Sequence, residues 1–256
     1  MIKFFQSANL LNGSNLLIAL PTHGICGNFA SDLLVKNNKF ERIGIYYSQY
    51  LYSSIGLHSD GNIHYNAELY FNSSKNLLLL NFLATVNTHY IQNFYDEFVK
   101  VFVDTYKVKE ITLFGSADHT YIRADKELFN KNVDSFFLSN SQTDFENKYK
   151  LRKLESFLVE PKKKEFEELK LIEGQSFIKK FIKLLSKSKI TYSYVFVLAI
   201  GVFDPFAGLG LYNKLCYIHG LSNEDTIVQR DFNSITSFFQ GFKLNIDPGW
   251  LLFLKE

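Results

Sequence analysis

The stretch "LLIALPTHGICGNFASDLLV" (residues 16–35) constrains the fold more than any other part of the chain. An apolar run, Leu16 to Leu20, ends in a proline, and two glycines follow three positions apart, Gly24 and Gly27. Helical spacing then extends from Asn28 to Val35. Strand, glycine turn and helix in this order are typical of α/β proteins, some of which hold a phosphate at the helix N-terminus. The stretch predicts an α/β fold and raises the question of a phosphate site.

Strand-like and helix-like segments alternate along most of the chain. Apolar runs predict strands at 15–20, 42–47, 110–114 and 192–200, and "NSSKN" joins 63–71 to 77–84 as a β-hairpin. Helical spacing predicts helices at 28–35, from an N-cap at Thr88 to Tyr106, from Gly174 onward, and at 209–220. This alternation predicts one α/β domain over residues 1–256, with a mixed, mainly parallel sheet and helices on both faces.

A charged stretch from about 139 to 173 interrupts this pattern, and we expect it to be an insertion in the domain. After it, the helix that Gly174 opens carries apolar residues on one side and Lys179, Lys180, Lys183 and Lys187 largely on the other. No acidic residue occurs from Gln175 to Ile190. This basic face is either the solvated side of a core helix or a surface for an acidic protein or a membrane.

The composition restricts the classes of partner and the cellular compartment that we expect for this chain. The net charge of +2 is too small to indicate a nucleic acid or another polyanion as partner. The longest apolar run, 194–203, has half of the roughly 20 residues that a membrane span needs, so we expect no membrane segment. Two cysteines make no disulfide framework and indicate a reducing compartment, so the cytoplasm or the nucleus is the expected location.

The glycine turn does not match a known phosphate-binding motif. A Walker loop requires Lys-Ser/Thr after its last glycine, whereas Asn28 and Phe29 follow Gly27 here. The dinucleotide fingerprint requires three glycines, and only Gly24 and Gly27 are present. We therefore predict a structural turn and no cofactor.

Nucleophile and metal motifs are equally weak. Cys26 follows His23 closely at a helix start, which would activate a thiolate, but a buried and inert thiol is the preferred interpretation. "GSADHT" (115–120) places Ser, Asp and His in one loop, and neighbours in one loop cannot form a catalytic triad. The six histidines show no HExxH motif, so we expect no metal. No residue is predicted to be catalytic.

Several short motifs occur in an order that resembles the proteasome assembly chaperone 2 family. They are the opening stretch 16–35, "RIGIYYSQYLYSSIG" (42–56), "HYNAELYFNSSKNLLLLNFLATV" (64–86), "EITLFGSADHTYIRAD" (110–125), "LYNKL" (211–215) and "GWLLFL" (249–254). The similarity is good over residues 15–129 and thinner over 174–254, and it does not extend to the charged stretch between them.

The resemblance implies a non-catalytic chaperone of proteasome core-particle assembly. Such a subunit forms a heterodimer with proteasome assembly chaperone 1 on the α-ring. Family tails that end in hydrophobic–tyrosine–any residue insert into pockets between α-subunits. Here Leu254 fits the hydrophobic position, but Lys255 stands in place of tyrosine. Either the partner therefore supplies the inserted tail, or this tail binds in another manner.

Aromatic and apolar segments are the candidates for partner contact, since Tyr and Trp are enriched at interface hot spots. These candidates are Tyr46, Tyr47, Tyr50, Tyr52, Trp250, Leu251, Leu252, Phe253, Leu254, Lys255 and Glu256. For any one of these aromatics a core position is an equally good interpretation.

Two alternatives to the chaperone remain open. The first is a nucleoside-phosphorylase-like or hydrolase enzyme, which would need His23, Cys26 and His119 to converge on a pocket between the turns at 23–28 and 116–121. The second is a scaffold protein that keeps the fold and has another partner.

Overall fold

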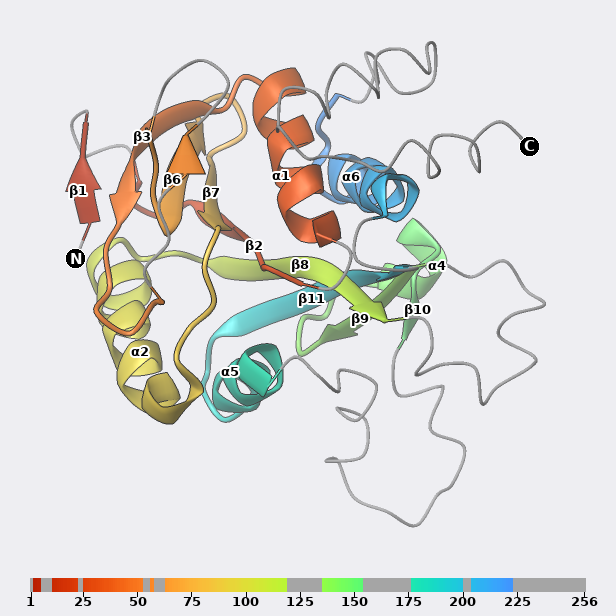
Figure 1. Cartoon of the computed structure of the whole chain (residues 1–256). Coiled ribbons are helices and arrows are strands. Elements are labelled where there is room, and N and C mark those ends of the chain that lie inside the picture. The colour runs from red at the N-terminus through yellow and green to blue at the C-terminus, as the bar shows by residue number, and fades with distance from the viewer. Residues whose placement is uncertain are drawn as a thin grey trace, which may run out of the picture.

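The chain folds into one large sheet with helices on both faces, as the computed structural model shows (Figure 1). The structure describes residues 2–5, 11–22, 25–52, 56–57, 63–118, 135–153, 176–199 and 204–222. The strands are β1 (Ile2–Phe4), β2 (Asn15–Ala19), β3 (Glu41–Tyr46), β4 (Gly56–Leu57), β5 (Ile63–His64), β6 (Ala67–Asn72), β7 (Leu77–Phe82), β8 (Glu110–Asp118), β9 (Ser135–Ser139), β10 (Arg152–Lys153) and β11 (Thr191–Ala199). The helices are α1 (Cys26–Asn37), the 3₁₀-helix η3 (Thr88–Tyr90), α2 (Ile91–Phe98), the π-helix η4 (Val99–Thr105), α4 (Phe145–Tyr149), α5 (Ser176–Ser186) and α6 (Pro205–His219).

The main sheet has the strand order β1-β3-β6-β7-β2-β8-β11-β9-β10. Its centre, from β7 through β2 and β8 to β11, is parallel. The strands on the β1 side, from β1 to β7, pair antiparallel, and so do β11 and β9. The predicted mixed α/β sheet is confirmed, but the expected predominance of parallel pairing is not, because four of the eight strand pairs described in this sheet are antiparallel. β4 and β5 form a separate two-stranded sheet.

Side chains alternate between two apolar cores, one on each face of the sheet, because successive strand residues point to opposite faces. In β2, Leu16 and Ile18 face the core under α2, η4 and α5, whereas Leu17 and Ala19 face the core under α1, α4 and α6. The first core is rich in phenylalanine; Phe94, Phe98 and Phe181, for example, lie 5.3–6.3 Å apart between ring centroids. Burying such rings on both faces excludes water from the central strands.

The helix predicted from an N-cap at Thr88 to Tyr106 differs from the observed one at its start and in its second half. Thr88, the predicted N-cap, is the first residue of η3. Asn87 caps η3, because its side chain accepts from His89 N, and the N-cap position of α2 is Tyr90. The predicted helix to Tyr106 continues past α2 as η4, a π-helix that hydrophobic spacing alone does not reveal.

The charged stretch begins later than predicted. Phe145 and Tyr149 of α4 are buried in the second core, and β10 pairs with β9. Residues up to Lys153 therefore belong to the domain, because their apolar side chains complete its core. The remaining part of the predicted insertion, 154–173, lies outside the described residues.

Candidate partner-binding surface

The glycine turn is tight because the start of α1 packs directly on the sheet. A Cβ added at Gly27 would lie 2.5 Å from the Leu20 carbonyl oxygen and 3.2 Å from that of Phe114. Leu20 directly follows β2 and Phe114 lies in β8, and their backbone atoms cannot move aside as a side chain could. Gly27 therefore lets α1 approach β2 and β8, and the predicted architectural role is confirmed for this glycine. Gly24 and His23 lie outside the described residues.

Polar groups at the carboxyl ends of these strands bond to one another. The hydroxyls of Thr22 and Ser116 share a hydrogen bond of 2.8 Å, and Ser116 N also donates to Thr22 Oγ1 at 2.8 Å. Both side chains are buried. The pair joins the end of β2 to β8 and so stabilises the edge at which α/β proteins commonly carry their sites.

The Cys26 thiol has the environment of a core residue. It is fully buried and donates to the Asp204 carbonyl oxygen at 3.4 Å. Burial raises the pKa of Cys26 to about 12, with the Asp204 charge adding to the rise. A nucleophilic thiol needs a lowered pKa and access to its substrate, and Cys26 has neither. His119, which the enzyme alternative requires, lies outside the described residues.

The described residues offer no cluster of three or more His, Cys, Asp or Glu that could bind a metal ion. Among the helices in the described ranges, none is long and apolar enough to cross a membrane.

The four tyrosines predicted as partner contacts differ in exposure. Tyr46 is 1% exposed, and its hydroxyl donates to Glu97 Oε1 at 2.9 Å, so it is a core residue of this chain. Tyr47 is 65% exposed and Tyr52 55% exposed. Tyr50 is half-buried against Tyr90, with ring centroids 6.0 Å apart. Partner contact stays a prediction for Tyr47, Tyr50 and Tyr52.

The sequence interpretation missed Tyr90, which is 52% exposed and whose ring lies against that of Tyr50. The chain segments of Tyr50 and Tyr90 are tied together, because Asn87 N donates to the Tyr50 carbonyl oxygen at 2.8 Å. No periodicity signals this contact between residues 40 positions apart. The predicted contact residues Trp250, Leu251, Leu252, Phe253, Leu254, Lys255 and Glu256 lie outside the described residues.

Helix α5 has the two-sided character that its sequence predicts. Its apolar side chains are buried, and they are Phe177, Ile178, Phe181, Ile182 and Leu185. Lys180 and Lys187 are exposed, whereas Lys179 and Lys183 are half-buried. The helix thus packs on the first core and presents lysines on the opposite side.

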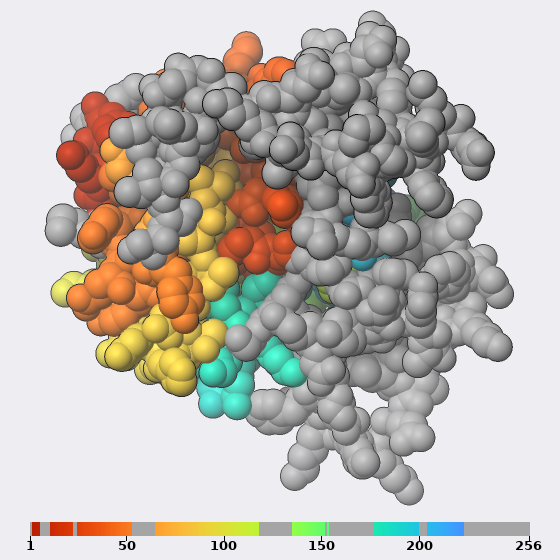
Figure 2. All heavy atoms as spheres, in the orientation of Figure 1, coloured from red at the N-terminus to blue at the C-terminus, as the bar shows by residue number. Residues whose placement is uncertain are grey.

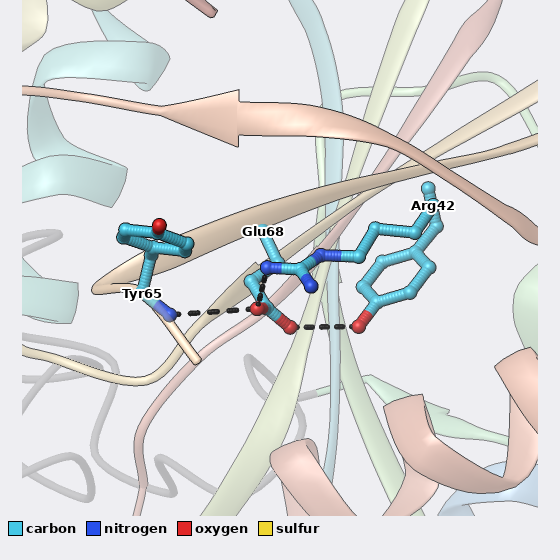
Figure 3. A network of polar contacts seen from close by, with 4 residues as sticks. Arg42, Tyr65 and Glu68 are labelled. Carbon is cyan, nitrogen blue, oxygen red and sulfur yellow. Dashed lines mark hydrogen bonds and ion pairs between the residues drawn. The ribbon is translucent and has the colours of Figure 1, made fainter. Parts of the chain in front are cut away.

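A buried carboxylate lies near the β1 edge of the sheet (Figure 3). Glu68 of β6 is 0% exposed and accepts from Arg42 Nη2 of β3 at 2.6 Å, from the Tyr70 hydroxyl at 2.7 Å and from Tyr65 N at 3.4 Å. The Arg42 guanidinium also lies 5.4 Å from the Phe5 ring centroid and 5.8 Å from that of Tyr65. Burial and the Glu68 charge raise the pKa of Tyr70, so its hydroxyl keeps its proton and donates. The network joins β3, β6 and the segment after β5.

One comparison with known proteins identifies a family. The model of the PAC2 family matches residues 16–195. PbaA from Pyrococcus furiosus, described as an archaeal homologue of proteasome-assembly chaperone, has a similar structure with a TM-score of 0.65 and 11% identity, over 92% of this chain and 93% of its own.

Two further solved structures share the fold. PbaB from the same organism, described as an archaeal proteasome activator, has a TM-score of 0.61 and 14% identity, over 94% of this chain and 97% of its own. A proteasome-assembly chaperone homologue from Mycobacterium tuberculosis has a TM-score of 0.53 and 11% identity, over 90% of this chain and 96% of its own. No curated protein sequence matches the chain. Because the family model covers well over half of its residues, the chain belongs to the PAC2 family.

Proposed function

We propose that this chain is a non-catalytic chaperone for assembly of the proteasome core particle, and that it acts as a heterodimer with proteasome assembly chaperone 1 on the α-ring. The observation that carries the proposal is the PAC2 family match over residues 16–195. Similar folds described as proteasome-assembly chaperone homologues, over nine-tenths or more of both chains, support it.

The chemistry of the carboxyl edge favours a role without catalysis. Burial raises the pKa of Cys26 to about 12 and withdraws the thiol from solvent, and Gly27 is required for packing. We expect Cys26→Ala to leave the assembly function unchanged, because the thiol would serve no chemical step. Loss of function in a Cys26→Ala chain that folds normally would contradict this part of the proposal.

A binding protein must present surface that its partner covers. The exposed rings of Tyr47 and Tyr52 offer such surface, since tyrosines often carry binding energy at interfaces. We propose that they contact the heterodimer partner or an α-subunit. We propose the cytoplasm and the nucleus as the locations of the chain, because its two cysteines make no disulfide framework and indicate a reducing compartment.

Depletion of the chain from its own cells tests the proposal. Native gels of the lysate, probed for α- and β-subunits, should show incomplete core particles accumulating and mature ones declining. Restoring the wild-type chain should reverse both changes.

The same cells separate a chaperone from a proteasome activator, the description given to PbaB. An activator raises the peptidase activity of mature core particles when added in purified form. We expect no such rise here. Normal assembly in depleted cells, together with stimulation by the purified chain, would replace the proposal with an activator role.

A further inference from the structure

We propose that Glu97 and Ser48 hold the exposed tyrosines of residues 47–52 in the position in which they meet a folded partner subunit. We name this pair the Glu97–Ser48 clamp. Both act as positioning residues and leave the contact itself to the rings. The inference rests on the proposed function, which makes Tyr47 and Tyr52 partner contacts, and it adds what keeps these rings in place.

The segment after β3 has an inner and an outer side. Ser48 and Leu51 are 6% and 7% exposed, whereas the rings of Tyr47 and Tyr52 lie mostly in solvent. Buried and exposed positions therefore follow one another closely along the segment. The outward direction of the two rings depends on the inner side chains staying where they are.

The Glu97 carboxylate connects this segment to α2. Its Oε2 atom accepts from the Ser48 hydroxyl at 3.3 Å, and its Oε1 atom accepts from the Tyr46 hydroxyl at 2.9 Å. The Ser48 hydroxyl oxygen in turn accepts from Tyr50 N at 3.3 Å. The Ser48 hydroxyl thus links the helix to the backbone of the segment, and a charged acceptor makes this link stronger than a neutral one would.

The position of Glu97 is itself fixed by the first core. Its neighbours on α2, Phe94 and Phe98, are both 0% exposed, so the helix cannot rotate without exposing them. The Tyr46 ring lies edge-on to those of Phe94 and Phe102, with ring centroids 6.3 and 5.3 Å away. Packing therefore holds both the helix and Tyr46, and the segment is the part that would move if the clamp were removed.

The other end of the segment is attached through its backbone. Tyr52 N donates to the Thr85 carbonyl oxygen at 3.0 Å, and Asn87 N donates to the Tyr50 carbonyl oxygen at 2.8 Å. Figure 2 shows the orange and yellow segments that contain these residues meeting at the lower left of the molecule. These bonds fix the end near Tyr52, and the clamp fixes the end near Tyr47.

Rings that are held before binding lose less freedom when a partner covers them. Ordering one side chain at an interface lowers affinity by about two- to tenfold. A folded subunit presents a surface of fixed shape, so it gains most from rings that are already in place. A preformed tyrosine surface therefore fits a folded subunit, which is the kind of partner that the proposed function requires.

Hydrogen exchange of the full chain, measured by mass spectrometry, tests the clamp without a partner. A peptide that covers residues 47–52 reports on the segment, and a peptide from α1 reports on the rest of the domain. Ser48→Ala removes the hydroxyl, and Glu97→Ala removes the carboxylate. The matched control is Asp96→Ala, which removes the same charge from the same helix, where Asp96 accepts from the Gln92 amide at 2.9 Å. The conservative variant, Glu97→Gln, keeps an acceptor oxygen and the length of the side chain.

We expect exchange in residues 47–52 to be at least about tenfold faster in Ser48→Ala and in Glu97→Ala, because each loses a hydrogen bond to a charged group. Ser48→Ala is the deciding variant, because it keeps the bond between Tyr46 and Glu97. In this variant exchange in α1 should stay within about twofold of the wild type. Asp96→Ala should behave as the wild type, and Glu97→Gln should lie between the wild type and Glu97→Ala. Unchanged exchange in Ser48→Ala, or equal increases in Ser48→Ala and Asp96→Ala, would overturn the inference.

The affinity of the full chain for proteasome assembly chaperone 1 tests whether binding depends on the clamp. The Tyr47→Ser/Tyr52→Ser variant should bind at least about tenfold more weakly than the wild type, and Ser48→Ala about two- to tenfold more weakly. Asp96→Ala should bind as the wild type does. Wild-type affinity of Ser48→Ala would overturn the inference and leave the proposed function intact. Wild-type affinity of Tyr47→Ser/Tyr52→Ser would instead refute the contact role of the two rings in the proposed function, and with it the binding role of the clamp.

Discussion

Arg42→Met tests how the buried Glu68 carboxylate is stabilised. Glu68 is 0% exposed and its counter-charge is Arg42 Nη2 at 2.6 Å, whereas the Tyr70 hydroxyl supplies a neutral donor at 2.7 Å. The substitution keeps an apolar stem beside the Phe5 and Tyr65 rings but removes the positive charge. The buried carboxylate then has to lose its charge or remain uncompensated.

The expected loss follows from the geometry. Removing one partner of a fully buried ion pair costs about 3–5 kcal/mol of unfolding free energy. The Arg42 side chain is 27% exposed, so solvent screens part of the attraction, and we expect about 2–3 kcal/mol. Glu68→Gln keeps an acceptor for Arg42 and should cost less, about 1–2 kcal/mol.

Urea unfolding of the two single variants and the double variant at pH 8 and pH 5 measures these values. Either substitution should lower the free energy of unfolding less in the double variant than it does alone. We expect the difference, which is the coupling energy between Arg42 and Glu68, to be at least about 1 kcal/mol. In Arg42→Met the folded-state pKa of Glu68 rises above its unfolded value, so the destabilisation should be full at pH 8 and smaller at pH 5. Additive losses that do not change with pH would refute the role assigned to the pair.

Three further predictions concern single buried groups. Gly27→Ala should lower the free energy of unfolding in urea by about 2–3 kcal/mol, because its Cβ would meet a backbone atom at 2.5 Å. The control, Gly210→Ala, should raise it by about 0.5–1 kcal/mol, because no described atom lies within 4 Å of the added Cβ. Equal effects of the two substitutions would contradict the packing role of Gly27. Tyr194→Phe should stabilise by about 1 kcal/mol, because the buried Tyr194 hydroxyl has no hydrogen-bond partner among the described residues; destabilisation would mean that a bound water pairs it. Burial lowers the pKa of His219 from 6.5 to about 4, so the folded state favours the neutral imidazole. The free energy of unfolding should therefore fall by on the order of 3 kcal/mol as the pH drops from 6.5 to 4. His219→Gln should not show this part of the acid destabilisation, and a variant with the same pH profile as the wild type would contradict the role of His219.

The fold was predictable from the sequence where the signal is local and periodic. The apolar runs that form β2, β8 and β11 are long enough to indicate buried strands, and α5 separates apolar residues from lysines at helical spacing. The architectural role of Gly27 was also predictable, because the residues after it lack phosphate-binding chemistry. The conformation of these elements is decided by residues that are close together in the sequence, so the sequence pattern predicts them.

The remaining features depend on contacts between distant residues. Glu68 looks like a solvent-facing position in an alternating strand, but it is 0% exposed and pairs with Arg42 of the neighbouring strand β3. Tyr46 and Tyr47 are equivalent in sequence, yet pleating places one in the core and leaves the other 65% exposed. The stretch after Ser139 looks like an insertion because of its charge, although Phe145 and Tyr149 supply part of the second core.

Affinity purification of the tagged chain from its own cells, with mass spectrometry of the proteins recovered, tests the chaperone role most directly. The account predicts a related α/β subunit together with proteasome α-subunits, and no mature activator complexes. Recovery of neither, with the chain behaving as a stable monomer or homo-oligomer, would contradict it.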